Sequence, residues 1–108
     1  AGLFALHPKH SEMTLAKAMG VLYRKQEQSP SIEGRFIALL ESDGETLAEP
    51  LRHCVTLLRS HELAIDYQRL LWDLADWLNP TRPEALDKLR RRWASDFYRV
   101  AATADSND

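Results

Sequence analysis

The chain has 108 residues, and its 14 Lys and Arg against 16 Asp and Glu give a formal net charge of −2 at pH 7. This length predicts one domain or a piece of one. The slightly negative balance argues against a free-standing, strongly basic nucleic-acid binder. The charge is unevenly spread, however, because residues 41–49 contain four carboxylates, whereas residues 82–99 are net positive. A local basic surface is therefore compatible with the composition.

Cys54 is the single cysteine, so the chain can form no internal disulfide, which fits a reducing cytoplasm. The sequence shows neither a signal peptide nor an apolar run long enough to span a membrane. Its first residue is not Met, and residues 2–8 resemble the last turns of a helix that Pro8 stops. We therefore expect a cytoplasmic protein, no membrane contact, and further residues N-terminal to this start.

The first half of the chain predicts two amphipathic helices. Thr14 can cap the first, which runs to about residue 26, and Ser31 can cap the second. Pro30 separates them, because proline cannot donate a backbone hydrogen bond inside a helix. Arg35 borders the apolar face of the second helix. The apolar residues recur at helical spacing and are Leu15, Ala18, Met19 and Leu22 in the first helix, and Ile32, Phe36, Leu39 and Leu40 in the second.

The third predicted helix follows a turn at Asp43-Gly44. Residues 46–49 fit a capping box. Pro50 is tolerated only in a first turn, which shifts the expected start of the helix toward Glu49. Arg52 lies on the side opposite the apolar stripe. That stripe consists of Leu51, Cys54, Val55 and Leu58.

The last two predicted helices lie on either side of residues 79–83, where two prolines interrupt the pattern. Asp66 can cap the first of them. Their apolar residues are Leu70, Leu74, Trp77 and Leu78 in the first, and Leu86, Leu89, Trp93, Phe97 and Val100 in the second. Residues 102–108 form a polar, acidic tail that we expect to be disordered. The sequence thus predicts an all-α fold, a compact bundle of about five helices forming a single helical domain over residues 1–101.

The last helix has the densest positive charge in the chain. At about 100° per residue, Arg90, Arg91 and Arg92 point in three different directions. Lys88 and Arg92 lie about 6 Å apart along one side, which is comparable to the spacing of phosphates on a nucleic-acid strand. A solvated charged face with pairs such as Asp87–Arg91 explains the same pattern, and for this helix alone we favour it.

The residues needed for catalysis do not converge in the sequence. His7 and His10 lack the further ligands of a zinc site. His53 and Cys54 are adjacent, so on a helix they point about 100° apart, and Cys54 is better explained as a small core residue. No glycine-rich phosphate loop is present. We therefore expect no catalytic site, no metal and no cofactor.

Aromatic and acidic residues of the last two helices have simpler structural explanations. Trp77 and Trp93 lie on apolar stripes and are expected in the core. Trp72 lies off the main stripe, so burial against a neighbour, a subunit contact and base stacking all remain open. Asp73 and Asp76 fit the polar face of an amphipathic helix.

A colinear series of stretches covers most of the chain between residues 14 and 101. These stretches are Thr14–Ala18, Ser31–Leu40, Leu51–His53, Leu57-Leu58, Ile65–Tyr67, Leu70–Leu74 and Arg91–Phe97. Together, this order of arginine-bearing helices, ending in a basic Trp-x-x-Asp-Phe helix, resembles the CasB family. That family is the small subunit of the type I-E CRISPR surveillance complex, Cascade.

This resemblance implies a helical, non-catalytic subunit whose family members are longer, with further N-terminal helices. It also implies the partners. These are guide RNA and target DNA, contacted through their backbones without sequence preference, the large and backbone subunits of Cascade, and a second copy of the chain. In that complex the family holds the R-loop, in which guide RNA pairs with one DNA strand and displaces the other.

The residues that we assign to nucleic acid are Arg24, Arg35, Arg52, His53, Arg90, Arg91 and Arg92. Arg35 matches the basic residue at the start of the family's Phe-Ile-x-Leu-Leu helix, and Arg52 and His53 match its Leu-Arg step. A neutral imidazole at His53 would add little charge at pH 7. The alternative is a helical protein–protein adaptor without nucleic-acid binding, in which the basic residues pair with nearby carboxylates.

Overall fold

The computed structural model describes residues 13–79 and 81–103. Within these two ranges the chain forms five α-helices and no β-strand, which confirms the predicted all-α fold. The helices are α2 (Leu15–Lys25), α3 (Pro30–Leu40), α4 (Ala48–Ser60), α5 (Tyr67–Trp77) and α6 (Pro83–Thr103). The predicted helix end over residues 2–8 lies outside the described residues. At the other terminus, α6 continues through Ala102 and Thr103, two residues further than predicted, and the rest of the expected tail is also outside the described residues.

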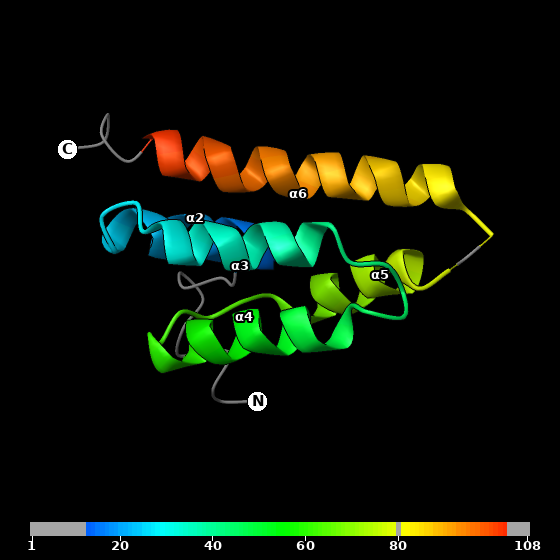
Figure 1. The fold of residues 1–108 in the computed structure, drawn as a ribbon, viewed down its shortest axis with the longest axis horizontal. Coiled ribbons are helices and arrows are strands. Elements are labelled where there is room, and N and C mark those ends of the chain that lie inside the picture. Colours follow the sequence, from blue (N-terminus) through cyan, green and yellow to red (C-terminus); the bar gives the residue numbers. More distant parts are fainter. Residues whose placement is uncertain (1–12, 80, 104–108) are drawn as a thin grey trace.

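The helices are arranged in layers (Figure 1). α6, the longest helix with 21 residues, runs along one side of the molecule and packs chiefly on α2 and α5. α2 and α3 form the middle, and α4 lies on the opposite side from α6 and packs mainly on α3. None of the helices in the described part of the chain is long and apolar enough to cross a bilayer.

Two of the predicted helix caps are confirmed. The hydroxyl of Thr14 accepts a hydrogen bond from the Lys17 backbone N–H at 3.2 Å, and the carboxylate of Asp66 accepts one from the Arg69 N–H at 3.0 Å. The predicted cap at Ser31 is wrong, because α3 begins at Pro30 and Ser29 takes the N-cap position. Proline is favoured in the first turn, where a missing N–H costs nothing, so Pro30 starts the helix instead of preceding it.

The predicted capping box at residues 46–49 is also not formed. Leu47 occupies the N-cap position of α4 and makes no side-chain cap. Thr46 instead closes the turn after α3, because its hydroxyl accepts from the Asp43 N–H at 3.1 Å and donates to the Asp43 carboxylate at 3.0 Å. The Thr46 hydroxyl thus hydrogen-bonds within the turn instead of capping the N-terminus of α4.

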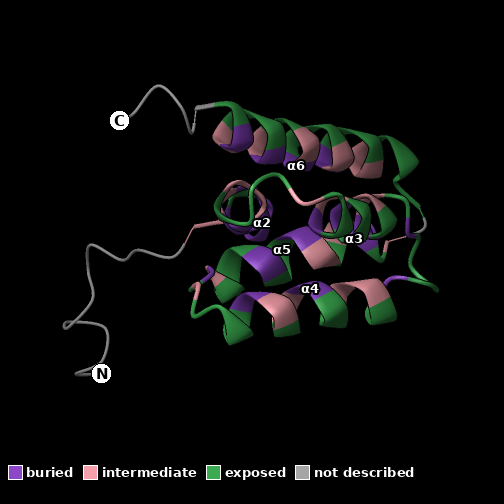
Figure 2. Ribbon diagram, turned by 60° about the vertical axis from the view of Figure 1, so that its left-hand side comes forward, coloured by how far each residue is buried: buried purple, intermediate pink, exposed green. Residues whose placement is uncertain are grey.

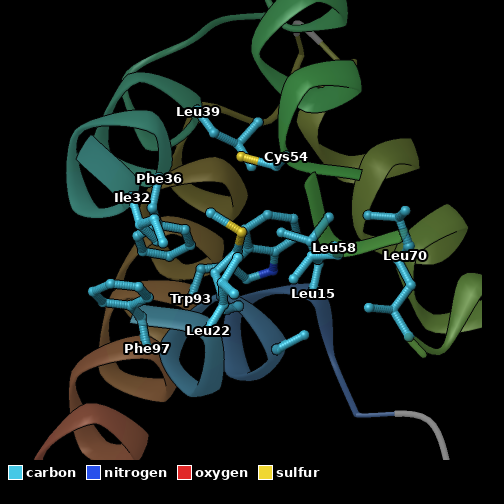
Figure 3. Packing of buried hydrophobic residues seen from close by; sticks show 14 of the residues in the cluster. Leu15, Leu22, Ile32, Phe36, Leu39, Cys54, Leu58, Leu70, Trp93 and Phe97 are labelled. Carbon is cyan, nitrogen blue, oxygen red and sulfur yellow. The ribbon is translucent and has the colours of Figure 1, made fainter. Parts of the chain in front are cut away.

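The core lies between the layers and receives side chains from all five described helices (Figures 2 and 3). The rings of Phe36 and Phe97 stack with their centroids 4.3 Å apart. Trp77 and Trp93 are both buried and meet edge to face at 4.9 Å, as their positions on apolar stripes predicted. Trp72 is 67% exposed, so burial inside this bundle is excluded and a subunit contact or a stacking role remains.

Candidate nucleic-acid interface

Helices α3 and α4 pack side by side and leave a shallow basic groove between them. Two adjoining depressions of about 360 and 190 Å³ form this α3–α4 groove. Their lining residues are Arg35, Ala38, Glu49, Pro50, Arg52, His53, Thr56, Leu57 and Ser60. Both depressions share Arg35 and His53, so three of the seven predicted residues meet in one place.

Buried neighbours fix the two walls of the groove. Arg35 precedes Phe36 and His53 precedes Cys54, and both Phe36 and Cys54 are fully buried. The Cys54 thiol donates to the backbone carbonyl of Arg35 at 3.7 Å, which ties α4 to α3 beneath the groove. Burial raises the pKa of the Cys54 thiol to about 12, so the group is a protonated packing residue at neutral pH, as its position predicted.

One carboxylate partly neutralises the α3–α4 groove. Oε2 of Glu49 lies 2.7 Å from Nη2 of Arg52 and 3.6 Å from Nε2 of His53. Arg35 is exposed, and no carboxylate of the described residues lies within ion-pair distance of it. With His53 neutral, the two arginines against one glutamate leave the groove with a net positive charge.

The three consecutive arginines of α6 do point in different directions, as predicted, and they differ in what they contact. Arg90 turns inward: its Nη2 donates to the Ser42 carbonyl at 2.7 Å, and its guanidinium lies over the Trp77 ring at 6.0 Å. Arg91 is exposed and, among the residues that the structure describes, makes no hydrogen bond or ion pair. The three do not form one surface, and the inward position of Arg90 gives no support to its predicted contact with a strand.

Arg92 is held by a buried carboxylate. Asp73 is 6% exposed, which corrects the prediction that it lies on a polar helix face. Its Oδ1 accepts from Arg92 Nη2 at 2.6 Å and lies 3.9 Å from Arg69 Nε. Its Oδ2 accepts from the Trp93 indole N–H at 2.9 Å. A buried tryptophan needs an acceptor for its N–H, and this requirement was the signal in the sequence that could have identified Asp73.

The remaining predicted residue, Arg24, lies apart from the α3–α4 groove. It is half-buried near the end of α2, and its Nη1 donates to the Val100 carbonyl of α6 at 3.5 Å. Thr56 and Ser60 also line the groove, although neither was among the predicted site residues. Their spacing from Arg52 places the three on one side of α4. The Thr56 hydroxyl could donate to an anion in the groove, whereas that of Ser60 donates to a backbone carbonyl of its own helix at 2.8 Å.

A third depression, larger than the two that form the groove, is lined by acidic instead of basic residues. It encloses about 570 Å³ beside the connection from α3 to α4. Asp43 and Glu45 line it together with Trp77, Leu78 and Leu86. His53 and Cys54, which were considered above as catalytic residues, do not line it. In the described part of the chain, no three His, Cys, Asp or Glu side chains gather where they could hold a metal ion.

By architecture the chain is a helical bundle similar to a solved structure, M. ruber CasB. The TM-score is 0.73 with 39% sequence identity, over 86% of this chain and 51% of that one. The CRISPR-associated protein Cse2 of Thermus thermophilus is 38% identical over 107 residues, which cover 97% of this chain and 57% of the relative. The family model of CRISPR-associated protein Cse2 matches residues 1–98. The chain therefore belongs to the CasB (Cse2) family, which confirms the resemblance, and it spans about half the length of these relatives.

Proposed function

We propose that this chain belongs to a non-catalytic small subunit of the type I-E CRISPR Cascade complex. It binds nucleic-acid backbone without sequence preference and so stabilises guide RNA–target DNA pairing and the displaced strand of the R-loop. The observation that supports this most is the α3–α4 groove, where Arg35 and Arg52 converge from two helices beside His53.

The chemistry of the groove suits phosphate. An arginine guanidinium is planar and can donate two parallel hydrogen bonds to phosphate oxygens. The groove is shallow and open at the surface, which fits a strand running through it better than an enclosed small molecule. In an RNA-guided complex base pairing reads the sequence, so the protein need only supply charge and shape.

The net charge of −2 fits a subunit that binds weakly alone and more tightly together with other subunits. Large and backbone subunits and a second copy, bound to the same guide RNA and target DNA, would raise the effective concentration of the groove near the strand. Arg91 and the outer edge of Arg92 would add a second, weaker contact on α6, since Arg92 is 44% exposed despite its bond to Asp73.

The alternative of a protein–protein adaptor also has an observation in its favour. Arg52 and Arg92 pair with carboxylates, as that alternative predicts. In addition, α5 presents large apolar side chains to solvent, with Tyr67 52%, Leu71 64% and Trp72 67% exposed. Exposed apolar surface of this kind marks protein contacts. The two functions are compatible in one subunit, because the groove and the α5 surface lie on different helices.

The test is fluorescence anisotropy of a labelled single-stranded oligonucleotide with the 108-residue chain, titrated with salt. We expect binding that weakens as salt rises and depends little on base sequence. Changing Arg35→Glu and Arg52→Glu together should weaken it at least about tenfold, because two phosphate contacts become repulsive. Arg82→Glu is the control, since Arg82 lines neither depression.

Equal binding by the double variant and the control variant would contradict the assignment of the groove. If the chain alone does not bind at low salt, the same variants are compared in reconstituted Cascade with a target DNA. An R-loop yield that the double variant leaves unchanged would then contradict the proposed function. Circular dichroism verifies that each variant keeps its helices.

A further inference from the structure

Glu49 contacts two of the residues that we assign to nucleic acid, Arg52 and His53. Its Oε2 makes the shortest contact of the α3–α4 groove, 2.7 Å to Arg52 Nη2, and the same oxygen lies 3.6 Å from His53 Nε2. A carboxylate and a phosphate offer a guanidinium the same kind of acceptor oxygens. Arg52 Nη2 already donates to Glu49, so a phosphate that takes two parallel hydrogen bonds including this nitrogen has to compete with Glu49 for it.

The charge balance of the groove depends on this one residue. The described residues that line it include two arginines and a single carboxylate, that of Glu49. Neutralising Glu49 would therefore double the net positive charge of the groove when His53 is neutral. It would also remove the repulsion between the Glu49 carboxylate and an incoming phosphate.

Displacing Glu49 is nevertheless easy. Its side chain is 63% exposed and that of Arg52 is 69% exposed, so both charges can be rehydrated when they separate. Exposed ion pairs of this type contribute little to stability. The Arg52–Glu49 ion pair can therefore form in the unbound chain and still break when a strand is brought close.

We propose that Glu49 is an internal competitor for the phosphate at the α3–α4 groove. It holds Arg52 in the unbound chain and yields it to a strand that the rest of the complex has positioned. This inference rests on the proposed function of the groove. Its consequence is that the unassembled subunit binds free nucleic acid a few-fold more weakly than it would without Glu49.

The test compares Glu49→Gln with the matched variant Glu84→Gln in the anisotropy titration. Both changes remove one negative charge from the exposed first turn of a helix, but Glu84 begins α6 and lines neither part of the groove. Glu49→Gln should bind the strand about two- to fivefold more tightly than the wild type, because an exposed ion pair contributes only a small free energy. The salt dependence should steepen, because Arg52 becomes free to neutralise a phosphate. Glu84→Gln should change binding less.

A double-mutant cycle with Arg52→Gln identifies the route of the effect. The gain from Glu49→Gln should disappear when Arg52 is already replaced. An equal gain in both backgrounds, or an equal gain from Glu84→Gln, would overturn the inference and leave the proposed function standing. If neither the chain nor the reconstituted complex showed binding that depends on Arg35 and Arg52, the proposed function would fail and the inference with it.

Discussion

Asp73 shows how one buried side chain can join two helices. Its carboxylate receives the Trp93 indole N–H and the Arg92 guanidinium from α6 while it belongs to α5. A buried charge is tolerated only when it is paired and hydrogen-bonded, and here both oxygens have donors. Arg92 is thus held in place by its partner, although 44% of its side chain stays exposed.

We expect Asp73→Asn to lower the free energy of unfolding by about 1–3 kcal/mol, because it removes charge-assisted hydrogen bonds from a buried site. Urea unfolding followed by circular dichroism measures the change. Asp76→Asn is the control, because the half-buried Asp76 side chain makes no hydrogen bond or ion pair with the described residues. This variant should lie within about 0.5 kcal/mol of the wild type. The same loss in both variants would show that the Asp73 contacts do not stabilise the fold.

At the level of the helices, two glycines differ in the space around them, although each lies in the middle of a helix. A Cβ at Gly20 of α2 would lie 2.7 Å from the Phe97 carbonyl and 3.1 Å from Val100 Cβ. Gly20 therefore permits the close approach of α2 to α6, where Phe97 enters the core. A Cβ at Gly34 of α3 would meet nothing within 4 Å, so no contact requires glycine there.

These surroundings predict changes of opposite sign. Gly20→Ala should destabilise the chain by about 1–3 kcal/mol, because the added methyl group meets backbone that must move. Gly34→Ala should stabilise it by about 0.5–1 kcal/mol, the gain in helix propensity at an open position. Thermal unfolding of both variants measures the difference. Stabilisation by Gly20→Ala would mean that α2 and α6 are not in such close contact.

At the scale of the whole molecule, two buried or hydrogen-bonded groups predict a loss of stability in alkali. Burial raises the pKa of Cys54 from 9.0 to about 12. Burial and the hydrogen bond to Glu33 raise the pKa of Tyr98 from 10.0 to about 12. The folded chain holds these protons more tightly than the unfolded chain. The resulting stabilisation is complete below about pH 9 and is lost as the pH rises toward 12.

For Cys54, a pKa shift of this size should lower the free energy of unfolding by about 2 kcal/mol between pH 9 and pH 11. Tyr98 is 42% exposed, so its contribution is screened and smaller. Urea unfolding of the wild type and of Cys54→Ala under reducing conditions, at both pH values, measures the effect. The variant should lose less stability than the wild type between these pH values, and parallel losses would contradict a buried thiol.

Periodicity in the sequence was enough to place the helices and the aromatic core, because Trp77, Trp93 and Phe36 sit on stripes that only burial explains. It failed at Leu78, which is 53% exposed and lies at the C-cap of α5, one residue beyond its last residue, Trp77. The pattern also predicted that the α6 arginines diverge. The spacing of Arg90 from Leu86 and Trp93 places it beside the apolar stripe, but its acceptor could not be predicted, since that acceptor comes from a residue 48 positions away.

The candidate site was predicted only in part, because it also depends on contacts between residues that are far apart in the sequence. Arg35, Arg52 and His53 could be selected from their positions on helix faces and from the family resemblance. Their convergence depends on how α3 packs against α4, which the pattern of either helix alone does not determine. Glu49 was interpreted as part of a capping box, so its contact with Arg52 was missed.

The carbonyl of Ser42 accepts both the Trp77 indole N–H at 2.9 Å and the Arg90 guanidinium at 2.7 Å. Ser42 lies in the connection from α3 to α4, whereas its donors come from α5 and α6. A peptide ending at Ser60 would therefore contain both walls of the groove but lose the hydrogen bonds that α5 and α6 make to their connection. The shape of this connection therefore depends on helices that lie outside the groove, so we expect the groove to need the whole bundle and not α3 and α4 alone.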